Sequence, residues 1–313
     1  GCVNTNVLTK KVEIPQWYLS VPLNNSVFIY GEGDSKHSIS DAKNNALSTM
    51  ASNLVVSVNS STSSTTQSSM NGVQNSYSKD VRRDVKVTVE KIKFTNAITE
   101  KSEQVDESFY VLMKVNRQEL FTNKKKEFDI IDDRLTTQFN ALNKYGKLEK
   151  IHILQSMYST IKTAKTQVIV LNAINNNFDQ APYIRKYDSY IDMISELKNN
   201  SSVMVKTNDQ KGYFADALTN VLNQNQYKVS NNNKSDVVIS LNNKVKYSIA
   251  RGWNIAKVST TISVILNNKI ISNTIINSVG RSSTSKESAL ENASQNFISQ
   301  IKEKTLDKVI FSK

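Results

Sequence analysis

The chain has 313 residues and a formal net charge of +12, from Lys+Arg 40 against Asp+Glu 28. At about 100–200 residues per domain, this length predicts two or three domains. A single cysteine excludes an intrachain disulfide framework, and with only two histidines it argues against a Cys/His zinc site or a Cys–His nucleophile pair. The sequence has no apolar run of about 18 residues or more, so it predicts no membrane-spanning helix.

The cysteine, Cys2, follows a small residue, Gly1, and precedes a polar stretch. A small residue before a cysteine is typical of the junction where a bacterial lipoprotein signal is removed. The thiolate can then form a stable thioether to a glyceryl lipid, and several acyl chains give lasting attachment to a membrane. We therefore expect lipid on Cys2 and a flexible tether over residues 1–13. The alternative is an unmodified thiol.

A first α+β domain is predicted over residues 14–120. Residues 26–30 predict a strand that stops at Gly31-Glu32-Gly33, and a helix capped by Ser38 or Ser40 follows. Valines alternate with polar residues over 81–90, and apolar residues alternate over 109–115, which predicts two further strands. Between them and the helix, the polar stretch 57–70 is either a mobile loop or a β-arm, and we favour the arm.

The middle segment, residues 121–200, predicts a helical hairpin. Apolar residues recur at spacings of three and four from Phe128 to Leu142 and again from Leu148 to Leu171, with Gly146 between the two runs. This pattern indicates two long antiparallel helices, and a third, shorter helix is predicted over residues 183–197.

A second α+β domain is predicted over residues 201–313. It contains a helix over 214–222, short strands at 237–241 and 245–249, and longer strands at 258–266 and 270–279 around an Asn267-Asn268 turn. A closing helix is predicted over 285–305. The fold class is therefore α+β, with two small α/β sheet-and-helix domains separated by a long antiparallel helical hairpin.

A short pattern recurs near the two ends of the chain, with the same spacing after a glycine. The two sets are Gly33, Ala42, Asn45 and Ala46, and Gly280, Ala289, Asn292 and Ala293. Each set follows an apolar strand and opens a helix, so we predict two related strand–turn–helix units.

Several features of the first domain are similar to a known family. They are Cys2, the opening Pro15-x-Trp17-Tyr18, the strand into Gly31-x-Gly33, the helix with Ala42 and Ala46, and the strand over 109–117. With these features the chain resembles the Lpp-twenty lipoprotein family of Helicobacter and Campylobacter envelopes over about residues 14–120. The resemblance implies a surface or periplasmic lipoprotein, with some relatives linked to flagellar discs or adhesion and no catalytic residues to transfer.

Three sets of residues could suggest a nucleotide-binding or catalytic site, but each is better explained by a structural or surface role. Gly31-Glu32-Gly33 lacks the third glycine of a dinucleotide fingerprint, because Lys36 occupies that position, so it predicts a tight turn. The carboxylates Asp129, Asp132 and Asp133 lie beside Lys124–Lys126 and predict an exposed, salt-bridged helix face. His37 and His152 have no nucleophile or carboxylate at a catalytic spacing, so we expect structural or surface histidines.

These observations predict a lipid-anchored protein of the outer membrane, facing the periplasm or the cell surface, with a structural or binding role and no enzymatic activity. We expect no catalytic or metal-binding residues, no cofactor and no nucleic-acid partner. The expected partners are the membrane through Cys2, envelope proteins through Trp17 and Tyr18, an anionic lipid or wall polymer through the positive charge, and a second copy of the chain. A host-facing adhesin and a periplasmic enzyme are the alternatives.

Overall fold

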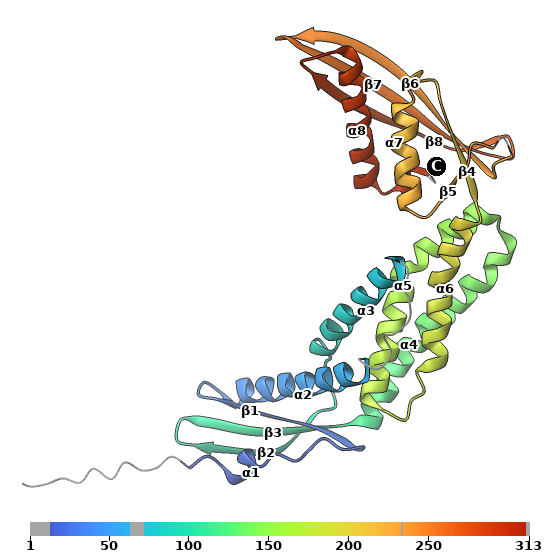
Figure 1. Ribbon diagram of the computed structural model, residues 1–313. Helices are drawn as coiled ribbons and strands as arrows, with labels where there is room; N and C mark the ends of the chain where they lie inside the picture. The colour runs from blue at the N-terminus through green and yellow to red at the C-terminus, as the bar shows by residue number, and fades with distance from the viewer. Residues whose placement is uncertain (1–12, 63–71, 233, 311–313) are drawn as a thin grey trace, which may run out of the picture. The chain divides into compact units, whose positions relative to one another are not determined.

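The computed structural model describes residues 13–62, 72–232 and 234–310 (Figure 1). The chain divides into two compact units. Unit 1 comprises Gly1–Asn140 and Met157–Tyr190, and unit 2 comprises Ala141–Ser156 and Ile191–Lys313. The predicted α+β class is correct, since each unit contains one sheet with helices packed on it. Cys2 and the rest of the predicted tether to residue 12 lie outside the described residues.

Unit 1 is built on a three-stranded antiparallel sheet of order β1-β3-β2. Its strands are β1 (Phe28–Ser35), β2 (Ile98–Val105) and β3 (Ser108–Asn116). The helices that precede β2 are α1 (Gln16–Leu19), α2 (Ile39–Thr62) and α3 (Gly72–Glu90). α2 packs mainly on β1 and β3, through buried Ala42, Ala46 and Met50.

β1 continues through Gly31 and Gly33, whereas the sequence predicted a turn there. The reason is the closeness of α2. A Cβ atom at Gly31 would overlap the carbonyl oxygen of Ala46, and one at Gly33 would overlap that of Ala42. The glycines therefore serve a close approach between the helix and the strand.

The strand predicted over residues 81–90 is wrong, because these residues belong to α3. Val81, Val85 and Val89 are spaced by four and all buried, while Val87 is 39% exposed. Arg83 interrupts the alternation, whereas the spacing of four from Val81 through Val85 to Val89 fits one face of a helix. The second strand of the sheet is instead β2, whose side chains are almost all exposed and show no apolar alternation.

The predicted β-arm over residues 57–70 is also wrong as far as the structure describes it, because α2 extends to Thr62. Within α2, the hydroxyl groups of Ser52 and Ser57 donate to the carbonyl oxygens of Ser48 and Asn53, at 3.0 and 3.1 Å. Polar side chains are thus satisfied inside a helix by bonds to the preceding turn. Residues 63–70 of the predicted arm lie outside the described residues.

The middle of the chain is helical. Its elements are α4 (Arg117–Asn140), the short 3-10 helix η1 (Ala141–Lys144), α5 (Lys147–Ile174) and α6 (Ala181–Asn199). Gly146 lies at the predicted break, directly before α5. The apolar stripe of α5 is buried from Leu148 to Leu171. The residues of α5 and α6 are divided between the two units.

Unit 2 is built on a five-stranded sheet of order β5-β4-β6-β7-β8. Its strands are β4 (Ser202–Thr207), β5 (Lys228–Val229), β6 (Val237–Ala250), β7 (Trp253–Leu266) and β8 (Lys269–Ser282). β4 runs parallel to β5 and β6, and the other pairs are antiparallel. The two short strands predicted over 237–249 are one strand, β6. The predicted Asn267-Asn268 turn is confirmed, with positive φ angles of 48° and 63°.

One face of this sheet carries the helices α7 (Tyr213–Gln224), α8 (Lys286–Lys304) and α9 (Leu306–Ile310). Phe214 of α7 and Phe297 of α8 meet with ring centroids 5.2 Å apart, and both are fully buried. They belong to a core that includes Val237, Ile239 and Val258 from the sheet. None of the helices in the described parts of the chain is long and apolar enough to cross a membrane.

The predicted repeat is present as matched geometry in the two units. Gly280 lies in β8 as Gly33 lies in β1, and a Cβ atom there would overlap the carbonyl oxygen of Ala289 in α8. Each helix begins after a capping serine, whose hydroxyl accepts from a backbone N–H three residues on at 3.0 Å, in the pairs Ser38–Asp41 and Ser285–Ser288. The shared residues therefore encode the same strand–turn–helix packing twice.

Both repeats also cover an open strand edge with helix side chains. From α2, Asn45, Thr49 and Asn53 donate to the backbone carbonyls of Asp34, Glu32 and Tyr30. From α8, Asn292 and Gln300 donate to the carbonyls of Arg281 and Asn277, and Asn296 accepts from the N–H of Val279. β1 and β8 are the outer strands of their sheets, so these bonds engage backbone groups that no neighbouring strand pairs.

Candidate interaction surfaces

Trp17 and Tyr18, the predicted interaction residues, are held on the sheet of unit 1. The indole N–H of Trp17 donates to Glu103 at 3.0 Å, and the hydroxyl of Tyr18 donates to Asp34 at 2.7 Å. Tyr18 also meets Tyr110 edge-on, with centroids 4.9 Å apart. Burial, and then the bond to Asp34, raise the pKa of Tyr18 above its usual range. These contacts attach α1 to the sheet, and a partner role for the two residues stays a prediction.

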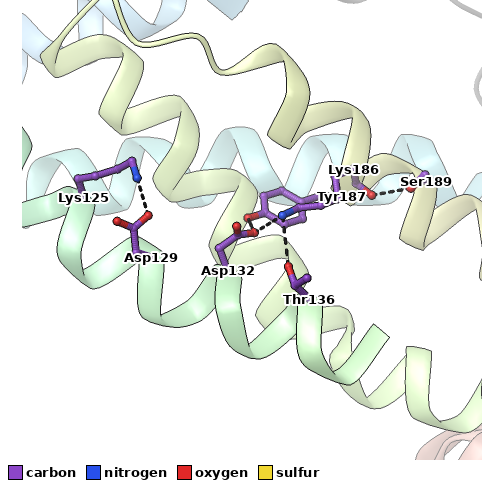
Figure 2. A network of polar contacts seen from close by, with 7 residues as sticks. All are labelled: Lys125, Asp129, Asp132, Thr136, Lys186, Tyr187 and Ser189. Carbon is purple, nitrogen blue, oxygen red and sulfur yellow. Dashed lines mark hydrogen bonds and ion pairs between the residues drawn. The ribbon is translucent and has the colours of Figure 1, made fainter. Parts of the chain in front are cut away.

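The predicted acidic face of α4 separates into an exposed part and a half-buried part (Figure 2). Asp129 accepts from Lys125 at 2.5 Å on the surface of the same helix, as the sequence predicted. Asp132 differs, because its side chain is only 16% exposed and faces α6. It accepts from the ammonium of Lys186 and from the hydroxyl of Tyr187, both at 2.5 Å. Asp132 therefore joins two helices and is not a solvated carboxylate.

Aromatic rings surround this network in unit 1. Phe128 of α4 meets Tyr183 of α6 edge-on at 5.2 Å, and Phe139 stacks on Tyr190 at 3.9 Å. Tyr187 is fully buried, and burial, followed by its bond to Asp132, raises its pKa beyond the usual range. Its hydroxyl therefore stays protonated and donates to Asp132. The arrangement fixes α4 against α6.

The two histidines lie in different parts of the chain, and the glycine pair lies within β1. His37 lies in the bend between β1 and α2, His152 lies on α5, and both are exposed. Gly31 and Gly33 are covered by the backbone of α2. Within the part of the chain that the structure describes, no group of three or more His, Cys, Asp or Glu residues is placed to hold a metal ion.

The end of the β6–β7 hairpin in unit 2 exposes apolar and basic side chains together. Trp253 is 48% exposed, and an open hollow beside it is lined by Ala250, Arg251, Trp253, Ile255 and Arg281. Strand alternation and register place one set of side chains on a single face, opposite α8. We call this set the hairpin-end surface: Lys246, Trp253, Ile255, Lys257, Val279 and Arg281.

Sequence reasoning missed this surface, although the sequence contains a signal for it. From Val237 to Ser282 there is no aspartate or glutamate. The same stretch contains Lys244, Lys246, Arg251, Lys257, Lys269 and Arg281. The net charge of the whole chain does not reveal this local excess, which depends on where the acidic residues are absent.

Comparisons with known proteins give weak fold similarities only. No family model and no curated protein sequence matches the chain, so the Lpp-twenty resemblance stays a prediction. Three solved structures are similar in part: a minor lipoprotein from Acinetobacter baumannii, a secreted protein from Helicobacter pylori and a lipoprotein from Neisseria meningitidis.

Their measures of similarity are low. The Helicobacter protein is 11% identical with a TM-score of 0.44, covering 88% of this chain and 97% of that one. The Acinetobacter protein is 10% identical with a TM-score of 0.28, covering 33% and 89%. The Neisseria protein is 15% identical with a TM-score of 0.24, covering 33% and 99%. We draw no functional conclusion from these values. The fold and the described sites define an α+β protein with an exposed apolar and basic surface.

Proposed function

We propose that this chain is a lipid-anchored protein of the bacterial outer membrane that acts by binding and catalyses no reaction. The observation that carries the proposal is the hairpin-end surface, which leaves Trp253, Lys246 and Lys257 exposed. By contrast, Asp132, the half-buried carboxylate of the acidic face, is bonded to Tyr187 across α4 and α6. Exposed aromatic and cationic side chains together are typical of a binding surface.

The lipid anchor rests on the sequence. Cys2 is the only thiol in the chain and follows a small residue, as the lipoprotein junction requires. Val3, rather than an aspartate, follows Cys2, which by the usual sorting rule permits export to the outer membrane. Protein partners in the envelope and a second copy of the chain are the other ligands that we propose.

Replacing Cys2 with serine tests the anchor. We expect wild-type protein to incorporate a clickable palmitate analogue and to stay with membranes after a wash in about 1 M salt, where screening removes contacts between surface charges. Cys2→Ser should incorporate no label and should be released by that wash. Incorporation of label by Cys2→Ser, or its retention after the wash, would contradict the lipoprotein assignment. Density fractionation of the wild type then shows whether the membrane is the outer one.

A further inference from the structure

We propose that the hairpin-end surface binds anionic phospholipid headgroups at a bilayer surface, with Trp253 entering the interface between headgroups and acyl chains. This names the ligand of the surface on which the proposed function rests. The site is an intrinsic second contact with a membrane, separate from any lipid on Cys2.

The charge of the surface argues for an anionic ligand. Lys246, Lys257 and Arg281 are all exposed, and no acidic residue occurs in the three strands that carry them. Arg251 adds a fourth cation in the turn that joins β6 to β7. A cationic residue close to an anionic bilayer contributes about fivefold to binding, so a cluster of this size is sufficient for reversible attachment.

One pair of lysines places two positive charges close together, which lowers the stability of the folded protein. Lys246 and Lys257 are directly opposite each other in the β6–β7 ladder and point to the same face. Like charges at such positions are destabilising. Neither lysine forms an ion pair with a carboxylate in the described structure. An anion bound from outside, such as a lipid phosphate, would relieve the repulsion between them.

The apolar side chains at the same end favour a lipid bilayer as the ligand over a nucleic acid or a charged sugar polymer. Trp253 precedes Ile255 and Lys257 on the same face of β7, and Val279 lies opposite Lys257 at 43% exposure. Ile249, on the other face of the hairpin end, is 70% exposed. Tryptophan favours the bilayer interface, because its ring is apolar and its N–H remains close to water. An exposed isoleucine near the end of the hairpin gains from an acyl-chain boundary, whereas a nucleic acid or a sugar polymer offers it little apolar surface.

Vesicle binding by the full-length Cys2→Ser chain, which carries no lipid, tests the proposal. We expect the protein to float with vesicles of equal parts phosphatidylglycerol and phosphatidylcholine at low salt, and not with phosphatidylcholine alone. About 1 M salt should abolish binding. Trp17 and Trp253 are the only tryptophans, so adding Trp17→Phe leaves Trp253 as the fluorescent reporter. Its emission should shift to the blue on binding.

A matched pair of double variants separates this site from general charge attraction. Lys246→Gln with Lys257→Gln should weaken vesicle binding at least tenfold, given about fivefold per cation. It should also fold at least as stably as the parent, because the opposed charges are gone. The control, Lys228→Gln with Lys269→Gln, removes the same charge from exposed positions at the opposite end of the same sheet, and should bind as the parent does.

Three results would overturn the proposal: no flotation of the parent with anionic vesicles, equal weakening by the two double variants, or an unshifted Trp253 emission. Binding of single-stranded DNA is measured in the same way. If the parent binds it, and the Lys246/Lys257 double variant binds it as much more weakly as expected for vesicles, the surface is assigned to nucleic acid instead. All these measurements use protein without lipid. Their failure therefore leaves the anchor on Cys2 untouched, and the palmitate experiment tests that anchor alone.

Discussion

Two glycines set the distance between strand and helix in the two units. Gly33 and Gly280 both lie under the backbone of the following helix, where a methyl group has no room. The alanines that face them, Ala42 and Ala289, are fully buried. Small residues on both sides allow the helix to approach the strand closely enough for its polar side chains to reach the backbone of the strand edge.

Replacing Gly280 with alanine should therefore be costly. The new Cβ atom would overlap the carbonyl oxygen of Ala289 and the amide nitrogen of Ala293, so α8 must shift away from β8. We expect a loss of about 3 kcal/mol or more in the free energy of unfolding, at the upper end for overpacked cores. Urea denaturation measures the change.

Gly146→Ala is the control for this prediction. The nearest atom to a Cβ there is the carboxylate of Glu149, at 3.9 Å, and no backbone atom lies in the way. Its stability should stay within about 1 kcal/mol of the parent or rise, because alanine restricts the unfolded chain. Equal stabilities for the two variants would mean that α8 and β8 are not in close contact.

Asp236 should make the free energy of unfolding of unit 2 depend on pH. It accepts from the N–H of Ser202 at 3.0 Å and lies 3.7 Å from the ammonium of Lys147. The backbone bond first, and then the lysine, lower the pKa of this carboxyl. A lowered pKa stabilises the folded state above the ordinary value of about 4, and this contribution is lost as the pH falls through the folded-state pKa.

The experiment compares Asp236→Asn with the parent across that range. The parent should be more stable at pH 7 by about 1 kcal/mol at most, because the ion pair is exposed. The difference should shrink as the pH falls below about 4. Thermal unfolding at each pH measures it, and a difference that persists unchanged in acid would contradict the assignment.

Among the helices, α4 and α6 are joined by one charged hydrogen-bond cluster in unit 1 (Figure 2). Tyr187→Phe should cost about 1.5–3 kcal/mol, because the half-buried carboxylate of Asp132 loses a hydrogen-bond donor. Asp132→Asn should cost a similar amount, and the double variant should cost clearly less than the sum. Urea denaturation of the three variants gives the coupling energy. Additive losses would show that the two side chains do not interact in solution.

The spacing of apolar residues predicted elements that bury one continuous stripe. α5 was located in this way. The β7–β8 turn was located from its two asparagines, because asparagine adopts the positive φ that these positions need. α3 was misassigned because its valines fit both periods, and β2 was missed because exposed strands show no apolar alternation. Local pattern alone did not distinguish these cases.

The sites were less accessible to sequence reasoning than the elements. Asp132 and Tyr187 are 55 positions apart, so their contact follows from helix packing that periodicity does not specify. Trp17 and Tyr18 were predicted to bind partner proteins, but their contacts with Glu103 and Asp34 were not predictable without the sheet register. The hairpin-end surface could have been predicted, since the stretch without acidic residues is visible in the sequence alone.

At the scale of the whole molecule, each unit contains one copy of the strand–turn–helix repeat. Matched substitutions therefore test whether the units unfold separately. Gly33→Ala should speed amide hydrogen exchange in β1 and α2 and leave β8 and α8 protected, while Gly280→Ala should do the reverse. Hydrogen exchange followed by mass spectrometry resolves these segments. Loss of protection in both units from either substitution would show a single cooperative structure.

The side chains that cover the edges of β1 and β8 affect how neighbouring copies of the chain can associate. Anchored to a membrane as we propose, copies of the chain would move in two dimensions and would meet one another more often than in free solution. Strand edges with free backbone groups would then join neighbouring copies into growing sheets. In this chain Asn45 and Thr49 already bind the carbonyls of β1, and Asn292 and Gln300 those of β8. These two edges are therefore protected from lateral strand addition even at high surface density.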